Sequence, residues 1–77
     1  MRYPIVIEQG ETNYGAYSPD VPGCGTVGDS IEEVKQNLIE AIEFHFEGLL
    51  LAGLTIPEPT PNIDFEYIEV QIPQTSN

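Results

Sequence analysis

Positive charge is almost absent from this 77-residue sequence, in which two basic residues, Arg2 and Lys35, stand against 13 acidic ones and the formal net charge is −11. Nucleic acids and anionic membranes are polyanions, so a protein that binds them needs cations that this chain lacks. The composition therefore predicts neither direct DNA binding nor membrane association, and it favours a basic partner. A second interpretation stays open, in which the acidity only keeps the chain soluble.

Cysteine is equally scarce. Cys24 is the only cysteine, so no intramolecular disulfide can form, and the sequence has no Cys/His cluster for structural zinc. A single thiol fits a reducing compartment, no stretch approaches the ~20 apolar residues of a membrane span, and the start does not resemble a signal peptide. We therefore expect a cytoplasmic protein. A core this small supplies only about 3–5 kcal/mol, so self-association is the expected reinforcement.

The first 27 residues carry the signals of a three-stranded antiparallel meander. Residues 3–9 alternate and are rich in Ile and Val, residues 10–13 suit a hairpin connection, and residues 14–18 predict a second strand. Residues 19–23 contain two prolines and a glycine, which favour a turn before a short third strand at residues 24–27.

A single long helix is predicted from Ile31 to Ala52. Ser30 is a good N-cap, and Glu33 follows three residues later, which makes a capping box. Gly53 is a natural C-terminal cap. A helical wheel gathers one face that is expected to pack on the sheet: Ile31, Val34, Leu38, Ala41, Ile42, His45, Leu49 and Ala52.

The chain is then expected to return to the sheet. Residues 55–61 contain three prolines and predict a stiff, extended connection, and residues 65–72 alternate as a last strand. The element order is therefore β-β-β-α-β, an α+β fold with one long helix packed on the sheet. We expect one domain over residues 1–77.

Two sets of side chains outside the predicted core suggest interfaces. Apolar residues spread beyond the core face near the end of the helix, and one small sheet can bury only one side of it, so we expect a homo-oligomer, a dimer or a tetramer. Acidic residues that no lysine offsets are the expected contacts for a basic partner. The expected oligomer interface is Phe44, Phe46, Leu50 and Leu51, and the expected partner contacts are Glu40, Glu43, Glu47, Tyr67 and Glu69.

Catalytic chemistry finds little support in the sequence. Cys24 and His45 are the only thiol and imidazole, and both are better explained as packing residues. The glycine-rich residues 23–28 lack the lysine and the spacing of a phosphate loop. We therefore predict no enzyme activity, no metal and no cofactor. Three carboxylates are better explained by the turn and the helix start than by a divalent ion: Asp20, Asp29 and Glu33.

The residues around the predicted turn form a longer pattern, Tyr14-x-x-Tyr17-Ser18-Pro19-Asp20-Val21-Pro22-Gly23-Cys24-x-Thr26-x-Gly28-Asp29-Ser30-x-x-Glu33, and Ile56-Pro57-Glu58-Pro59 follows the helix. This succession of aromatic strand, Pro-Gly-Cys turn, Thr-x-Gly-Asp segment, long helix and Pro-x-Pro stretch resembles the HicB-type antitoxin family. The resemblance spans about Tyr3 to Pro59, and its order and spacing make it fairly specific.

The resemblance implies a fold related to a truncated RNase H domain. It also implies the antitoxin role in a type II toxin–antitoxin system, in which the protein binds and neutralises a small basic HicA-like toxin that cleaves mRNA. Longer members of the family carry a C-terminal DNA-binding segment, and the sequence ends at Asn77 without one, so we expect a short form without operator binding.

Two alternatives stay open, a homo-oligomeric protein without a toxin and a metal-dependent nuclease of RNase H ancestry. The motif residues are expected to fix the fold rather than to contact a partner: Tyr17, Asp20, Pro22, Gly23, Thr26, Gly28 and Asp29.

Overall fold

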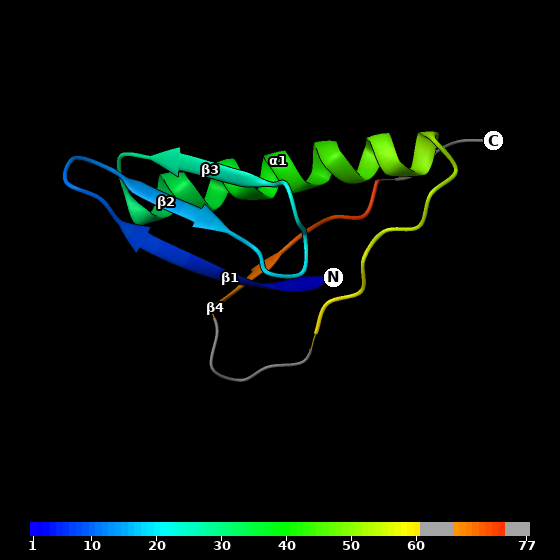
Figure 1. Ribbon diagram of the computed structural model, residues 1–77, viewed down its shortest axis with the longest axis horizontal. Coiled ribbons are helices and arrows are strands. Elements are labelled where there is room, and N and C mark those ends of the chain that lie inside the picture. The colour runs from blue at the N-terminus through cyan, green and yellow to red at the C-terminus, as the bar shows by residue number, and fades with distance from the viewer. Residues whose placement is uncertain (61–65, 74–77) are drawn as a thin grey trace.

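The computed structural model describes residues 1–60 and 66–73, and its element order is β-β-β-α-β, as the sequence predicts (Figure 1). The four strands form one antiparallel sheet in the order β3-β2-β1-β4, so the predicted meander is present and the last strand joins it beside β1. The expected α+β arrangement is thereby confirmed. The elements are β1 (Arg2–Gln9), β2 (Tyr14–Tyr17), β3 (Gly25–Gly28), α1 (Ile31–Leu51) and β4 (Glu66–Glu69).

β4 is shorter than the strand predicted over residues 65–72, of which residue 65 lies outside the described residues. Val70 still donates its N–H to the carbonyl of Met1 at 2.8 Å, but the N–H of Gln71 meets the carboxylate of Glu43 on α1 at 2.8 Å. The segment after β4 therefore leaves the sheet and crosses to the helix (Figure 1).

Local sequence sets both ends of α1. At the start, the Ser30 hydroxyl accepts the N–H of Glu33 at 3.0 Å, and the Glu33 carboxylate accepts the N–H of Asp29 at 3.4 Å. At the end, Gly53 takes a φ of +78°, and the N–H of Leu54 bonds back to a carbonyl of the last turn at 2.9 Å, which closes a Schellman-type cap. The helix thus begins and ends within one residue of the predicted limits.

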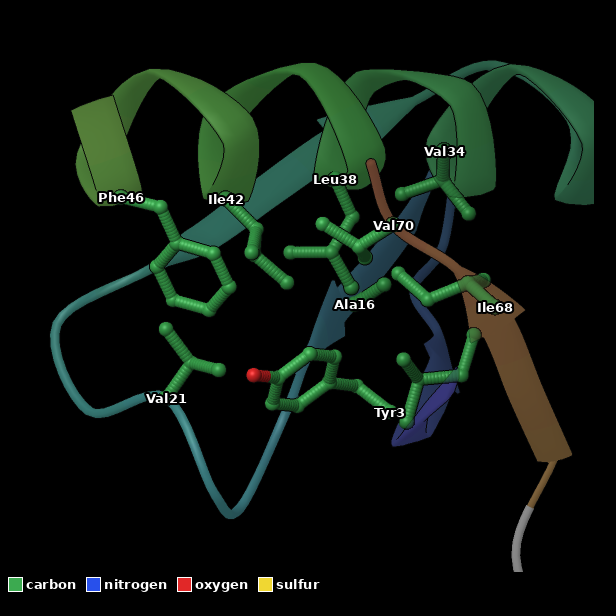
Figure 2. Packing of buried hydrophobic residues seen from close by; sticks show 10 residues of the cluster. Tyr3, Ala16, Val21, Val34, Leu38, Ile42, Phe46, Ile68 and Val70 are labelled. Carbon is green, nitrogen blue, oxygen red and sulfur yellow. The ribbon is translucent and has the colours of Figure 1, made fainter. Parts of the chain in front are cut away.

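α1 covers one face of the sheet, and the core lies between them (Figure 2). The buried helix residues are spaced four apart, and each step turns by about 40° beyond a full turn because an α-helix has about 3.6 residues per turn. The line of contact therefore drifts round the helix toward its C-terminal end. The core consists of Tyr3, Ile5, Ala16, Val21, Val34, Leu38, Ile42, Phe46, Ile68 and Val70.

This drift corrects the predicted faces of the helix. Phe46, which we expected in an oligomer interface, is wholly buried, and its ring centroid lies 5.4 Å from that of Tyr3 (Figure 2). His45, expected on the core face, is half-buried, whereas Ile31 and Ala52 at the two ends of that face are exposed. A helical wheel assumes a contact line parallel to the helix axis, but the buried residues here follow an inclined ridge.

Close contacts seat the N-terminal half of α1 on β3. A Cβ at Gly28 would lie 2.7 Å from the backbone nitrogen of Val34 and 2.9 Å from its Cα, so this approach requires glycine. The Thr26 hydroxyl donates to the Val34 carbonyl at 3.3 Å, and the Asn37 side chain donates to the Val27 carbonyl at 2.9 Å. The C-terminal part of α1, by contrast, extends past the N-terminal end of β3 (Figure 1).

Candidate functional site

The acidic residues expected to contact a partner are not equivalent in the structure. The Glu43 carboxylate accepts the Gln71 N–H at 2.8 Å, and the Glu69 carboxylate lies 2.8 Å from the amine of Met1, so the chain itself engages both. Glu40 and Glu47 are exposed on α1. Of the acidic contacts expected on the helix, these two glutamates therefore remain accessible to a partner.

The two basic residues of this protein, Arg2 and Lys35, contact β4 rather than Glu40 and Glu47. Lys35 pairs with a carboxylate of β4 at 2.7 Å, and the Arg2 guanidinium lies over an aromatic ring of the same strand, 5.1 Å from its centre. Glu40 accepts a hydrogen bond from the neutral side chain of Gln36 at 3.1 Å. The negative charges of Glu40 and Glu47 are thus not offset by a basic side chain of this chain.

Tyr67 and Glu69 lie on the opposite side of the molecule. Ile68, between them, is buried in the core and pairs with Tyr3 of β1. Successive side chains of a strand point to opposite faces of a sheet, so Tyr67 and Glu69 point away from α1. The partner contacts expected from the sequence therefore do not form one continuous surface.

Exposed apolar side chains gather at the C-terminal end of α1. Phe44 is 78% exposed and Leu51 is 73% exposed, the two highest values for large hydrophobic residues in the described part of the chain. Leu54, just past the helix, is also exposed, and Leu50 is half-buried. Three of the four residues expected in an interface are thus accessible, and Phe46 is not.

A shallow groove of about 640 Å³ lies between α1 and the β2–β3 turn, with Phe44 and Leu51 among its lining residues. Gly48 also lines it, and a Cβ built on Gly48 would meet nothing within 4 Å. Gly48 is not among the site residues expected from the sequence, although a glycine inside a predicted helix was the available signal. The other lining residues are Gly23, Cys24, Gly25, Ala41, His45, Glu47 and Leu49.

The groove holds the single thiol and the single imidazole of the sequence, Cys24 and His45. Burial raises the pKa of the Cys24 thiol, which disfavours the thiolate form that a nucleophile needs. Within residues 1–60 and 66–73, no group of three or more His, Cys, Asp or Glu side chains converges to hold a metal ion. In the same residues, no helix is long and apolar enough to cross a membrane. What the geometry offers is an apolar surface with acidic side chains beside it.

The motif residues of the turn make mostly structural contacts. The Asp20 carboxylate accepts the N–H and the hydroxyl of Thr60 at 2.6 and 2.9 Å, which ties the turn to the proline-rich connection. Gly23 takes a φ of +87°, a conformation that favours glycine. Tyr17 is exposed, but it pairs with Val6 of β1 and with Gly25 of β3, and Pro22 is exposed in the turn.

Comparisons with known proteins point to one family. A family model described as "HicB_like antitoxin of bacterial toxin-antitoxin system" matches residues 3–71. The chain is 44% identical over 61 residues to an uncharacterized 14.9 kDa protein from the rep-hol intergenic region of Haemophilus phage HP1. That match covers 79% of this chain and 46% of the phage protein, so the chain spans about half the length of this relative.

Two solved structures share the fold. The N-terminal domain of Burkholderia pseudomallei antitoxin HicB superposes with a TM-score of 0.81 at 24% identity, covering 92% of this chain and 99% of that chain. A chain from a HicA3 and HicB3 toxin–antitoxin complex superposes with a TM-score of 0.68 at 32% identity, covering 80% of this chain and 72% of that chain. The first likeness confirms the arrangement of one sheet and one long helix.

Proposed function

The chain belongs to the family of HicB-like antitoxins of bacterial toxin–antitoxin systems, and on that premise we propose that it binds and neutralises a small, basic, RNA-cleaving toxin of the HicA type. The observation that carries the proposal is the family match over residues 3–71. The likeness to a chain of the HicA3 and HicB3 complex supports it, as does a net charge of −11.

The proposed mechanism is steric and electrostatic, without catalysis by this chain. An enzyme that cleaves RNA presents positive charge to its anionic substrate. The acidic side of α1 around Glu40 and Glu47 would occupy that surface in place of the RNA. Opposite net charges speed the encounter of the two proteins, and the effect falls steeply as ionic strength rises.

The test is association kinetics with a HicA-like protein of the same genome, at low and at high salt. Reversing both charges in Glu40→Lys plus Glu47→Lys should slow association at low salt by about tenfold or more. The matched control is Glu8→Lys plus Glu11→Lys, which changes the net charge equally at exposed positions of β1 and the hairpin. The control should slow association less, because its charges lie away from α1.

Two results would count against the proposal. If the unaltered chain neither binds the HicA-like protein nor restores growth when the two are expressed together, the antitoxin function is wrong. If the two double variants slow association equally, the net charge matters and the surface on α1 does not.

A second candidate is a homo-oligomer that acts without a toxin, and the exposure of Phe44 and Leu51 favours it. This alternative predicts a dimer or a tetramer at micromolar concentration that Leu51→Glu would weaken. Sedimentation of the unaltered chain and of the Leu51→Glu variant would check it, and a monomer throughout would exclude it.

The nuclease alternative predicts RNA or DNA cleavage with Mg²⁺ or Mn²⁺, which we expect a purified sample not to show.

A further inference from the structure

Four exposed residues of α1 form a seam with the spacing of a helix–helix interface. Glu40, Phe44, Glu47 and Leu51 follow one another at intervals of four, three and four residues, the pattern by which one helix presents a continuous edge to another. Acidic and apolar side chains alternate along this seam. The solvent side of a surface helix is normally polar throughout, so two large apolar groups here are not explained by the isolated fold.

Gly48, beside the seam, gives a second and independent indication. A glycine inside a helix costs about 1 kcal/mol relative to alanine. Gly48 does not have a positive φ, and an added Cβ would meet nothing within 4 Å, so neither the backbone nor the packing of this chain requires it. What its missing side chain does is to keep the groove open between Phe44 and Leu51. A side chain entering from another molecule would use that space.

The charges of the seam distinguish between a second copy of this chain and a basic partner. A second copy laid along the seam would place Glu40 and Glu47 against the same carboxylates or against Phe44 and Leu51. Either pairing removes four carboxylates from water without supplying a cation, which is strongly unfavourable. A basic segment would pair with the same carboxylates and cover the same apolar groups.

We propose that this seam and groove are the docking site for a cationic amphipathic helix of the partner protein. Lys or Arg side chains of that helix, seven residues apart, would lie against Glu40 and Glu47, which are two helical turns or about 10.5 Å apart. An apolar side chain three or four residues beyond the cation that faces Glu47 would enter the groove over Gly48, between Phe44 and Leu51. The proposal rests on the proposed function, because it describes how the basic partner is held.

The direct test uses a designed peptide, because it does not depend on knowing the toxin. The probe is a helical peptide of about 20 residues with two lysines seven residues apart and a leucine four residues beyond the second lysine on the same face. A control peptide of identical composition places the lysines and the leucine on different faces. Binding is followed by NMR chemical shifts of the labelled protein at low salt.

We expect the matched peptide to shift residues of the seam, of Gly48 and of the β2–β3 turn, and to bind at least tenfold more tightly than the control peptide. Gly48→Leu should fill the groove and weaken binding about tenfold, while circular dichroism and thermal unfolding show that the fold is kept. Val27→Ser, at an exposed apolar position on β3, should leave binding unchanged. Glu47→Gln should weaken binding and reduce its salt dependence.

Three outcomes would overturn the inference: equal binding of the two peptides, no shifts at millimolar peptide, or shifts that centre on Val27 and the outer face of the sheet. Without peptide, shifts at the seam that depend on protein concentration would show that a second copy occupies the seam, and this would also overturn the inference.

Measurements with the HicA-like protein separate the two proposals. If the Gly48→Leu and Phe44→Ala variants bind the HicA-like protein with the same affinity as the unaltered chain, this inference fails while the antitoxin function stands. If the peptide docks as described but the toxin is not bound, the proposed function fails alone.

Discussion

Phe44 and Phe46 stand two residues apart on α1, yet Phe44 is 78% exposed and Phe46 is wholly buried. Two positions along a helix turn the side chain by about 200°, so one ring packs against Tyr3 and the other faces solvent beside the groove. The same kind of residue thus serves two purposes. Burial explains Phe46 through the stability of the fold, whereas Phe44 is not buried by the fold, and the docking site proposed above would give it a role.

The largest expected effect comes from truncating these two rings. Phe46→Ala leaves a cavity at the junction of α1, β1 and the turn, and we expect it to lower the free energy of unfolding by about 3–5 kcal/mol. Phe44→Ala removes an exposed ring and should change it by no more than about 0.5 kcal/mol. Urea denaturation of both variants would measure the difference. Similar losses of stability in the two variants would contradict the assignment of Phe46 to the core and Phe44 to the surface.

The glycines of the two regions give the next largest contrast. Gly28→Ala drives a Cβ to 2.7 Å from a backbone atom of α1, so we expect a loss of about 1–3 kcal/mol. Gly48→Ala meets open space in a helix interior and should raise the free energy of unfolding by about 0.5–1 kcal/mol. The two substitutions should change the free energy of unfolding in opposite directions, and thermal unfolding would measure both changes. A destabilising Gly48→Ala would mean that glycine is needed there for the fold itself.

The two neighbouring carboxylates on α1 provide a smaller test. Glu43→Ala removes the acceptor for the Gln71 N–H and should cost about 1 kcal/mol. Glu47→Ala removes an exposed carboxylate and should leave the free energy of unfolding within about 0.5 kcal/mol of the original. Both variants change the net charge equally, so their difference isolates the hydrogen bond. If Glu47→Ala costs as much as Glu43→Ala, the contact between the helix and the segment after β4 contributes nothing.

The smallest expected effect is a fall in stability at alkaline pH, which arises from two partly or wholly buried groups, Tyr3 and Cys24. Burial, followed by the charges of Glu58 and Asp20, raises the pKa of Tyr3 above its ordinary value of about 10. The folded state then holds its proton more tightly than the unfolded chain, so this contribution is complete below about pH 10 and is lost as pH rises toward the folded pKa.

Burial raises the pKa of the Cys24 thiol as well, so the same decline begins above its ordinary value of about 9. Denaturation at a series of pH values should therefore show falling stability above about pH 9. Tyr3→Phe loses the hydrogen bond to the Pro57 carbonyl at 2.6 Å but should flatten the upper part of that decline. An unchanged slope in Tyr3→Phe would assign the decline to other groups.

Prediction from the sequence succeeded where the deciding contacts are local. Ser30, Glu33 and Gly53 placed the ends of α1 correctly, because the bonds that cap a helix join residues only a few positions apart. The alternation in the first strands predicted the meander for a similar reason, since short turns leave neighbouring strands little choice but to pair. The candidate site was located only coarsely, on the acidic and apolar side of α1.

The sequence by itself determined the negative charge, the ends of the helix, the order of elements and the family. Only the tertiary structure decided that Phe46 belongs to the core and Phe44 to the surface, and that Glu43 is bonded within the chain while Glu40 and Glu47 face outward. The physical reason is that a helix meets its sheet along an inclined ridge, whose direction depends on strands distant in the sequence. When the contact line rotates by a fraction of a helical turn, a core residue becomes an exposed residue.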